Sequence, residues 1–275
     1  MGPIHLTVTD LDRSVGWYQS ALGLRVHGLE PPVAHLGDGA ATVLVLTEDP
    51  AATSAGRHAG LYHYALLYPT REDLARAAVR LAATRTPIQG ASDHGTHEAI
   101  YLPDADGIGI ELAADRPREL WPTPEEEFSR GRPLPLDLDG LLATVSGEAR
   151  PDRVAEGLRV GHVHLHVGSI ERGLEFYRDT VGFDVWALLP TAAFVSAGGY
   201  HHHLGFNTWL GEGVPPQPPS VVGLRHWTIE LPSEDDVAAV RARLEAAGAP
   251  IEVTDGGFLT SDPFEIPLRV VKEGS

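Results

Sequence analysis

The 275-residue chain contains no cysteine. Disulfide bonds, thiolate nucleophiles and cysteine-ligated zinc or iron–sulfur centres are therefore excluded. Any metal ion must be held by histidine and carboxylate side chains. Because the chain has 14 histidines, their placement is the most informative feature of the sequence.

Basic residues are scarce, with 21 Lys+Arg against 38 Asp+Glu and a net charge of −17 at pH 7. This charge repels phosphate backbones and anionic lipid surfaces, so we expect neither nucleic acid nor a membrane as a partner. The sequence also lacks the apolar core of a signal peptide and any apolar run of about 18 residues. We therefore expect a soluble, cytoplasmic protein. The hydrophobic fraction of 43% is sufficient for two domains with their own cores.

Two stretches of the chain repeat each other. Residues 6–18, LTVTDLDRSVGWY, return as residues 165–177, LHVGSIERGLEFY, and in this register His5 falls on His164. A repeat in constant register indicates two copies of one supersecondary unit. A metal-binding type of residue therefore occupies the same strand face in both copies.

Each copy has the pattern of a βαβββ unit. In the first copy a short β-type segment precedes Asp10 and Asp12, either of which can cap the following helix, and Gly23 ends that helix. Apolar stretches separated by Gly and Pro then indicate three strands. A second kind of unit begins before His63 and is itself repeated around His226.

The four units predict an α+β fold. We expect them to pair into two domains, each an open, curved, mixed β-sheet barrel that encloses a cavity and carries its helices outside. The predicted N-terminal domain is 1–115 and the predicted C-terminal domain is 159–275. Between them, residues 116–158 are rich in Pro and charge and are predicted to form a connector.

Several short motifs occur together in these units. They are H-x-x-V at 5–8, D-L-x-x-S at 10–14, W-Y at 17–18, L-G-L at 22–24 and D-x-D-G-x-x-I-E-L at 104–112. This combination resembles the vicinal oxygen chelate superfamily, which includes glyoxalases, bleomycin-resistance proteins and extradiol dioxygenases. The His-rich run at 196–209 looks most like the two-domain catechol 2,3-dioxygenases.

The resemblance implies a metal site. In this superfamily the ligands come from the first strands of two units and the last strand of the second, which gives His5, His63 and Glu111 as metal ligands. The usual first ligand position aligns with Pro3, but His5 lies two residues later and keeps the same strand face. Two imidazoles and one carboxylate suit Fe(II), with Mn(II), Ni(II) or Zn(II) as alternatives.

The resemblance also implies catalytic side chains near this metal. The catalytic tyrosine of the superfamily lies ten residues before the carboxylate ligand, which corresponds to Tyr101 here. Such a hydroxyl can bind a substrate oxygen and help to remove its proton. His94 approaches the same region from the preceding loop and is a candidate substrate contact.

The second copy has diverged from the first. His162 and His226 occupy ligand positions there, and His202 aligns with a histidine that assists oxygen activation in the extradiol enzymes that the chain resembles. However, Arg269 stands where the carboxylate is expected and Leu259 where the tyrosine is expected. We therefore treat His162, His202 and His226 as a second candidate cavity, and we place the metal in the first.

Three functions follow as hypotheses. The leading one is an Fe(II)-dependent extradiol dioxygenase that opens a small catechol-type aromatic with O2. The second is a glyoxalase-like isomerase or lyase, and the third is a small-molecule binding protein of the antibiotic-sequestering type. The sequence leaves open whether the protein is a monomer or a homodimer.

Overall fold

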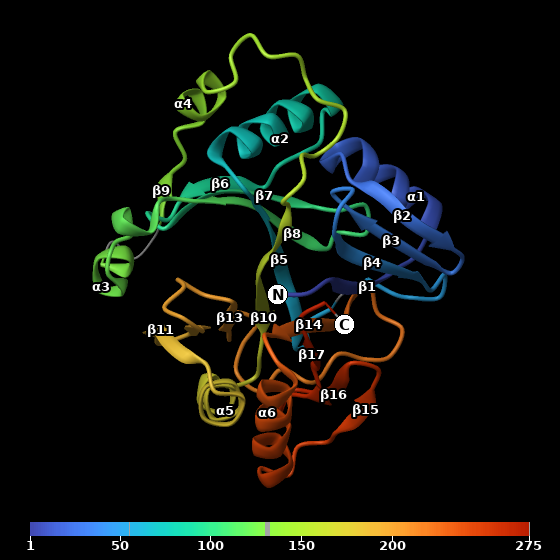
Figure 1. Cartoon of the computed structure of the whole chain (residues 1–275), viewed down its shortest axis with the longest axis vertical. Helices are drawn as coiled ribbons and strands as arrows, with labels where there is room; N and C mark the ends of the chain where they lie inside the picture. The colour runs from blue at the N-terminus through green and yellow to red at the C-terminus, as the bar shows by residue number, and fades with distance from the viewer. Residues whose placement is uncertain (55, 130–132, 275) are drawn as a thin grey trace. The chain divides into compact units, whose positions relative to one another are not determined.

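The computed structural model describes residues 1–54, 56–129 and 133–274 (Figure 1). These residues fall into two compact units. One, called here the C-terminal unit, comprises Met1–Thr7, Ala52–Tyr62 and His162–Ser275. The other, called here the N-terminal unit, comprises Val8–Ala51 and His63–Gly161. The chain passes from one unit to the other at four points. Three lie within the strands β1 (Ile4–Val8), β5 (Gly60–Tyr68) and β10 (Arg159–His166), and the fourth lies just before Ala52, between β4 and β5. The division into domains 1–115 and 159–275 stays a prediction.

Two βαβββ patterns have their helices and later strands in the N-terminal unit. The first continues from β1 as α1 (Leu11–Trp17), η1 (Tyr18–Leu22), β2 (Arg25–Glu30), β3 (Val33–Gly37) and β4 (Thr42–Glu48). The second continues from β5 as α2 (Arg71–Thr84), β6 (Gly90–Asp93), β7 (His97–Pro103) and β8 (Gly109–Asp115). Strand β5 runs parallel to β8, and β8, β7 and β6 follow in antiparallel order. Figure 1 shows α2 along the sheet that contains these strands, where it packs on β8.

Local chemistry fixes where the helices begin and end. The Asp10 side chain caps α1 by accepting a hydrogen bond from the backbone N–H of Arg13. Thr70 caps α2 in the same way, by accepting from the backbone N–H of Asp73. Gly23, with φ of 74°, ends η1 in the left-handed region. The structure thus places the first helix where the sequence predicts it.

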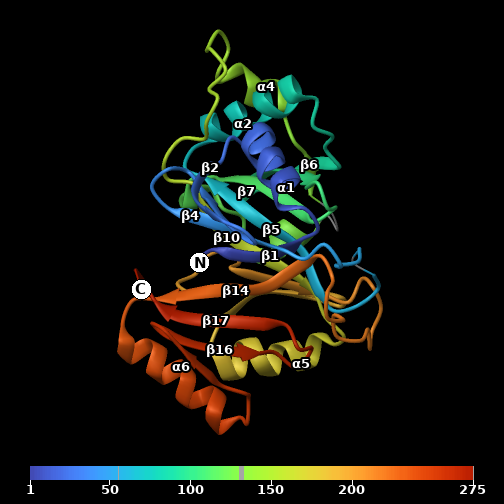
Figure 2. The same cartoon turned by 90° about the vertical axis from the view of Figure 1, so that its right-hand side faces the viewer.

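The C-terminal unit repeats the same order of elements. After β10 come α5 (Ile170–Leu174), η3 (Glu175–Val181), β11 (Asp184–Leu189), β12 (Ala192–Ser196) and β13 (Leu204–Asn207). The last elements are β14 (Gly223–Leu231), α6 (Glu234–Ala246), β15 (Glu252–Thr254), β16 (Gly257–Ser261) and β17 (Pro267–Lys272). Strand β1 pairs antiparallel with β14, and β14 runs parallel to β17. Figure 2 shows β14, β17 and β16 side by side, with α6 packed against them. The predicted α+β class with open, mixed sheets is confirmed.

A buried tyrosine–aspartate hydrogen bond recurs in both units. The Tyr18 hydroxyl donates to Asp104 at 2.7 Å, and the Tyr177 hydroxyl donates to Asp262 at 2.7 Å. The other oxygen of each carboxylate accepts from two backbone N–H groups of its own turn. Burial raises the pKa of Asp104, and it raises the pKa of Asp262 to about 6. These pairs join the helix after each first strand to the turn before each last strand.

The predicted connector at 116–158 carries short elements that the sequence analysis missed. They are η2 (Arg118–Leu120), α3 (Pro124–Phe128), β9 (Leu134–Pro135) and α4 (Leu138–Ala143), and residues 130–132 lie outside the described residues. Strand β9 pairs with β6, and α4 packs on α2. Among the helices that the structure describes, none has the length and apolar character needed to cross a membrane.

Candidate metal centre

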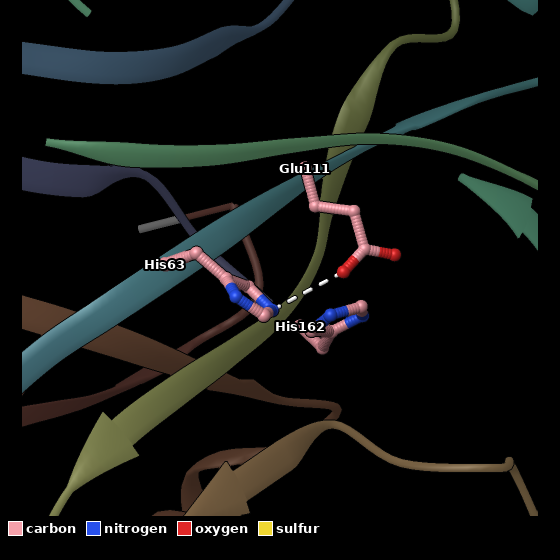
Figure 3. A group of neighbouring side chains, drawn as sticks. All are labelled: His63, Glu111 and His162. Atoms are coloured by element: carbon pink, nitrogen blue, oxygen red, sulfur yellow. Dashed lines mark ion pairs between the residues drawn. The ribbon is translucent and has the colours of Figure 1, made fainter. Parts of the chain in front are cut away.

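Two strands of the N-terminal unit bring His63 and Glu111 together. Ala65 on β5 lies opposite Glu111 on β8, and His63 shares the face of Ala65 because strand side chains alternate. As a result, His63 Nε2 lies 3.1 Å from Glu111 Oε2 (Figure 3). Both residues are buried, with 8% and 2% of their surface exposed. Two of the three ligands predicted for the first cavity are thus in contact.

A third side chain, His97, binds the other oxygen of the same carboxylate. Its Nε2 lies 3.0 Å from Glu111 Oε1, and its Nδ1 lies 2.9 Å from the Thr96 hydroxyl. Burial acts to lower the pKa of His97, but the hydrogen bond and the charge of Glu111 outweigh it and raise the pKa above its usual value. His97 therefore fixes the orientation of Glu111. No sequence motif marks His97, although its place four residues before Tyr101 puts both side chains on one strand face.

Tyr101 and His94 form a hydrogen-bonded pair beside this carboxylate. Tyr101 on β7 lies directly opposite Glu111 on β8, so both side chains share one face of the sheet. The Tyr101 hydroxyl lies 2.8 Å from His94 Nε2. A tight turn, closed by a hydrogen bond from His94 N–H to the His97 carbonyl, stacks the His94 and His97 rings at 4.4 Å. The Tyr101–His94 hydrogen bond holds one proton between the phenol oxygen and the imidazole nitrogen. A pair of this kind can take up or release a proton during a reaction.

A second imidazole, that of His162 on β10, belongs to the group around Glu111. One potential ligand atom from each of His63, Glu111 and His162 lies within 4.8 Å of the others. Figure 3 shows these three side chains and the ion pair between His63 and Glu111. His162 is 2% exposed and directly follows Gly161, the last residue of the N-terminal unit. Two imidazoles and one carboxylate are a donor set that divalent transition metals take, so these residues fit a metal ion.

His5, the third predicted ligand, is placed differently from His162. In the C-terminal unit it lies opposite His226 in the β1–β14 pair, and the two rings stack at 3.9 Å. Burial, together with the charges of Arg269 and Arg225, lowers the pKa of His226 to about 4. His226 therefore stays neutral, which suits a ring stacked on another imidazole.

The other two residues of the second candidate cavity lie against each other. His162 and His202 approach each other within the C-terminal unit, with ring centroids 4.1 Å apart, and His202 Nδ1 lies 2.8 Å from His201 Nδ1. Arg269 instead donates from Nη2 to the backbone carbonyl of Asp255 at 3.0 Å. The Arg269 guanidinium is therefore hydrogen-bonded to the backbone, at the position where the other copy has its carboxylate.

The fold and this cluster define a protein of paired βαβββ units with a candidate His/carboxylate metal site. Residues 1–112 and 159–260 match the family described as the Glyoxalase/Bleomycin resistance protein/Dioxygenase superfamily. The match covers most of the chain. The protein belongs to this superfamily, as its motifs predict.

One curated relative is similar over almost the whole chain. The chain is 38% identical over 268 residues to a protein of Bacillus subtilis (strain 168) named catechol-2,3-dioxygenase, covering 96% of this chain and 93% of the relative. This likeness confirms the prediction that the protein is an enzyme of the extradiol dioxygenase-like type.

Solved structures share the fold at low sequence identity. Glyoxalase I from Zea mays is 18% identical, with a TM-score of 0.59 over 98% of this chain and 92% of that one. The cppA protein from Streptococcus pneumoniae TIGR4 is 13% identical, with a TM-score of 0.60 over 98% and 96% of the two chains. At such identities the likeness extends to the fold, which hosts several functions.

Proposed function

We propose that this protein is a metal-dependent extradiol dioxygenase that cleaves a catechol-type aromatic ring with O2. The observation that carries the proposal is the arrangement around Glu111, whose two oxygens contact His63 and His97 while Tyr101 shares its sheet face. The curated relative named catechol-2,3-dioxygenase supports the choice of substrate class.

His63, Glu111 and His162 would hold the metal ion. Fe(II) is the ion we propose, because two histidines and one carboxylate are the ligand set of non-haem Fe(II) oxygenases. When bound, the ion supplies the Lewis-acid and redox chemistry that brings a catechol and O2 into reaction. This choice takes His162 in place of the sequence-predicted His5. Among the described residues, only His162 has a ring nitrogen that forms a group with ligand atoms of His63 and Glu111 in which all three atoms lie within 4.8 Å of one another.

The protein side chains would position groups and move protons. The hydrogen bond between Tyr101 and His94, at 2.8 Å, provides a hydroxyl and an imidazole that share one proton. A catechol hydroxyl placed against this pair can lose its proton to it, which we propose as the acid–base role of Tyr101 and His94. His97 would hold Glu111 in one orientation from the side opposite His63.

The test is turnover of catechol by the protein loaded anaerobically with Fe(II) and then exposed to O2. The proposal predicts stoichiometric O2 uptake and a yellow ring-opened product. Metal-loaded protein that consumes no O2 with several catechols, and instead isomerises a glutathione adduct, would favour the glyoxalase-like hypothesis. Binding of a small molecule without stoichiometric metal would favour the binding protein.

A further inference from the structure

A separate cavity lies in the N-terminal unit. It shares no residue with the candidate metal centre or with the second candidate cavity named above. It has a volume of about 500 Å³ and lies between α2, the start of β2 and residues 151–155 of the connector. Its charged lining consists of Arg25, Asp73, Arg76, Arg80, Asp152 and Arg153. Four arginines and two aspartates leave this lining net positive, in a chain whose total charge is −17.

Three of these arginines are bonded to neutral groups. Arg80 donates to the carbonyls of Leu22 and Pro151 at 3.1 and 3.0 Å. Arg25 donates to the carbonyl of Asp38 at 2.8 Å, and Arg153 donates to that of Leu24 at 3.5 Å. Arg76 differs, since it pairs with the carboxylates of Asp73 and Glu148. In the described part of the chain, Arg25, Arg80 and Arg153 form no ion pair, so their charges remain available to a ligand.

Two residues that line the cavity each have a buried donor with no hydrogen-bond partner among the described residues. The donors are Arg80 Nε and the Tyr68 hydroxyl, and the two residues are 3% and 2% exposed. Burying an unpaired charge or donor costs free energy that a bound anion would recover. Burial lowers the pKa of Arg80, and the charges of Arg150 and Arg153 lower it further. Burial raises the pKa of Tyr68 to about 12, so its hydroxyl stays protonated and can donate.

We propose that this cavity binds a small organic anion through a carboxylate or phosphate group. Guanidinium groups match the paired oxygens of both anions, and several of them converge here with a phenol that can donate a further hydrogen bond. The volume falls in the range of small-molecule sites, so the ligand carries an organic body besides its oxyanion. The site does not depend on the metal or on the proposed dioxygenase activity.

Calorimetric titration of the full-length protein at low ionic strength tests the site, with citrate and glycerol 3-phosphate as probes and glycerol as the neutral control. We expect saturable binding of one charged probe per chain, weakened by added NaCl, and no heat from glycerol. The probe that binds more tightly distinguishes a carboxylate site from a phosphate site. Absence of saturable binding by both charged probes would overturn the proposal.

Two variants connect the binding to this cavity. Arg153 is exposed, so Arg153→Gln removes a charge with little effect on the core, and Tyr68→Phe removes a hydroxyl that has no partner among the described residues. Each should weaken binding about 10-fold, whereas the exposed control Arg159→Gln should leave the affinity unchanged. Wild-type affinity in both Arg153→Gln and Tyr68→Phe would contradict the proposal, as would an equal loss in Arg159→Gln. Thermal unfolding without probe checks that all variants fold.

Discussion

The β7–β8 hairpin of the N-terminal unit and the β16–β17 hairpin of the C-terminal unit pair in the same register. At the matching position one carries a carboxylate and the other a guanidinium group. In the N-terminal unit Tyr101 lies opposite Glu111, and in the C-terminal unit Leu259 lies opposite Arg269. The buried tyrosine–aspartate bond, by contrast, is the same length in both units. Duplication has therefore kept the contacts that hold the fold and has changed the side chains that face the site.

The difference extends to the neighbours of these residues. In the N-terminal unit His97 shares a hydrogen bond with the Glu111 carboxylate, whereas at the matching place of the C-terminal unit the backbone of Asp255 accepts from Arg269. One hairpin thus supports a carboxylate that can bind a cation, and the other supports a fixed cation. A metal centre fits the first hairpin, and the second would repel a metal ion.

The largest effect should come from Glu111→Gln. This change keeps the size of the side chain but removes the charge that we propose binds the metal, so kcat should fall by more than about 100-fold. Steady-state O2 uptake with a catechol measures it. Arg269→Gln, the matched change in the other hairpin, should leave kcat within a factor of about two. A large loss in Arg269→Gln with little loss in Glu111→Gln would reverse the comparison.

Tyr101→Phe should lower kcat by about 100-fold, because it removes the hydroxyl proposed to exchange a proton with the substrate. The metal content should stay at the wild-type level, which separates a catalytic loss from a loss of metal. Leu259→Met serves as the control at the matching position and should have no effect on turnover. Equal turnover of Tyr101→Phe and wild type would remove Tyr101 from the mechanism.

His97→Ala should weaken metal binding by about 10- to 100-fold, as expected when a partner that orients a ligand is removed. Competition with a metal chelator measures the affinity. His97→Gln retains a side-chain N–H donor and should recover part of the loss. If His97→Gln and His97→Ala behave alike and both match wild type, Glu111 does not depend on His97 for its orientation.

The next prediction concerns the stability of the C-terminal unit and leaves turnover aside. The pKa of Asp262 is raised from 3.8 to about 6 in the folded protein, so its contribution to stability is full below pH 3.8 and is lost as pH rises through about 6. The loss amounts to about 3 kcal/mol of unfolding free energy. Asp262→Asn should remove this part of the pH dependence, measured by urea unfolding at about pH 4 and pH 7.

Asp106 provides a control, because its contribution to stability changes with pH in the opposite direction to that of Asp262. Burial acts to raise its pKa, but hydrogen bonds from Thr9 and Arg13 outweigh burial and hold the pKa below its usual value, so its contribution is present at pH 7 and lost in acid. Asp106→Asn should therefore destabilise the protein more at pH 7 than in acid. Identical pH dependence in Asp262→Asn and wild type would show that Asp262 does not titrate in this range.

Part of this site can be read from the sequence, because it depends on local pattern. The repeat predicts the four units, which need only strand alternation and turn residues. The choice of His63, Tyr101 and Glu111 as site residues came instead from the resemblance to the superfamily. Strand alternation then accounts for their side chains lying on one face of the sheet.

Other features depend on which strand edges pair, and no local pattern determines that. Strand β1 pairs with β14, so His5 lies against His226. The sequence also places His162 in the second copy, although its ring nitrogen lies within ligand distance of His63 and Glu111. His97 was missed because a buried histidine has no motif of its own, and its role depends on the geometry of Glu111.

We propose one metal centre in this protein, with His63 and Glu111 among its ligands. Elemental analysis after anaerobic Fe(II) loading and desalting tests it most directly, with wild type, His63→Ala, Glu111→Ala and His226→Ala compared in parallel. We expect one iron per chain in wild type and in His226→Ala, and none in His63→Ala or Glu111→Ala. Iron retained in His63→Ala and Glu111→Ala but lost in His226→Ala would contradict it.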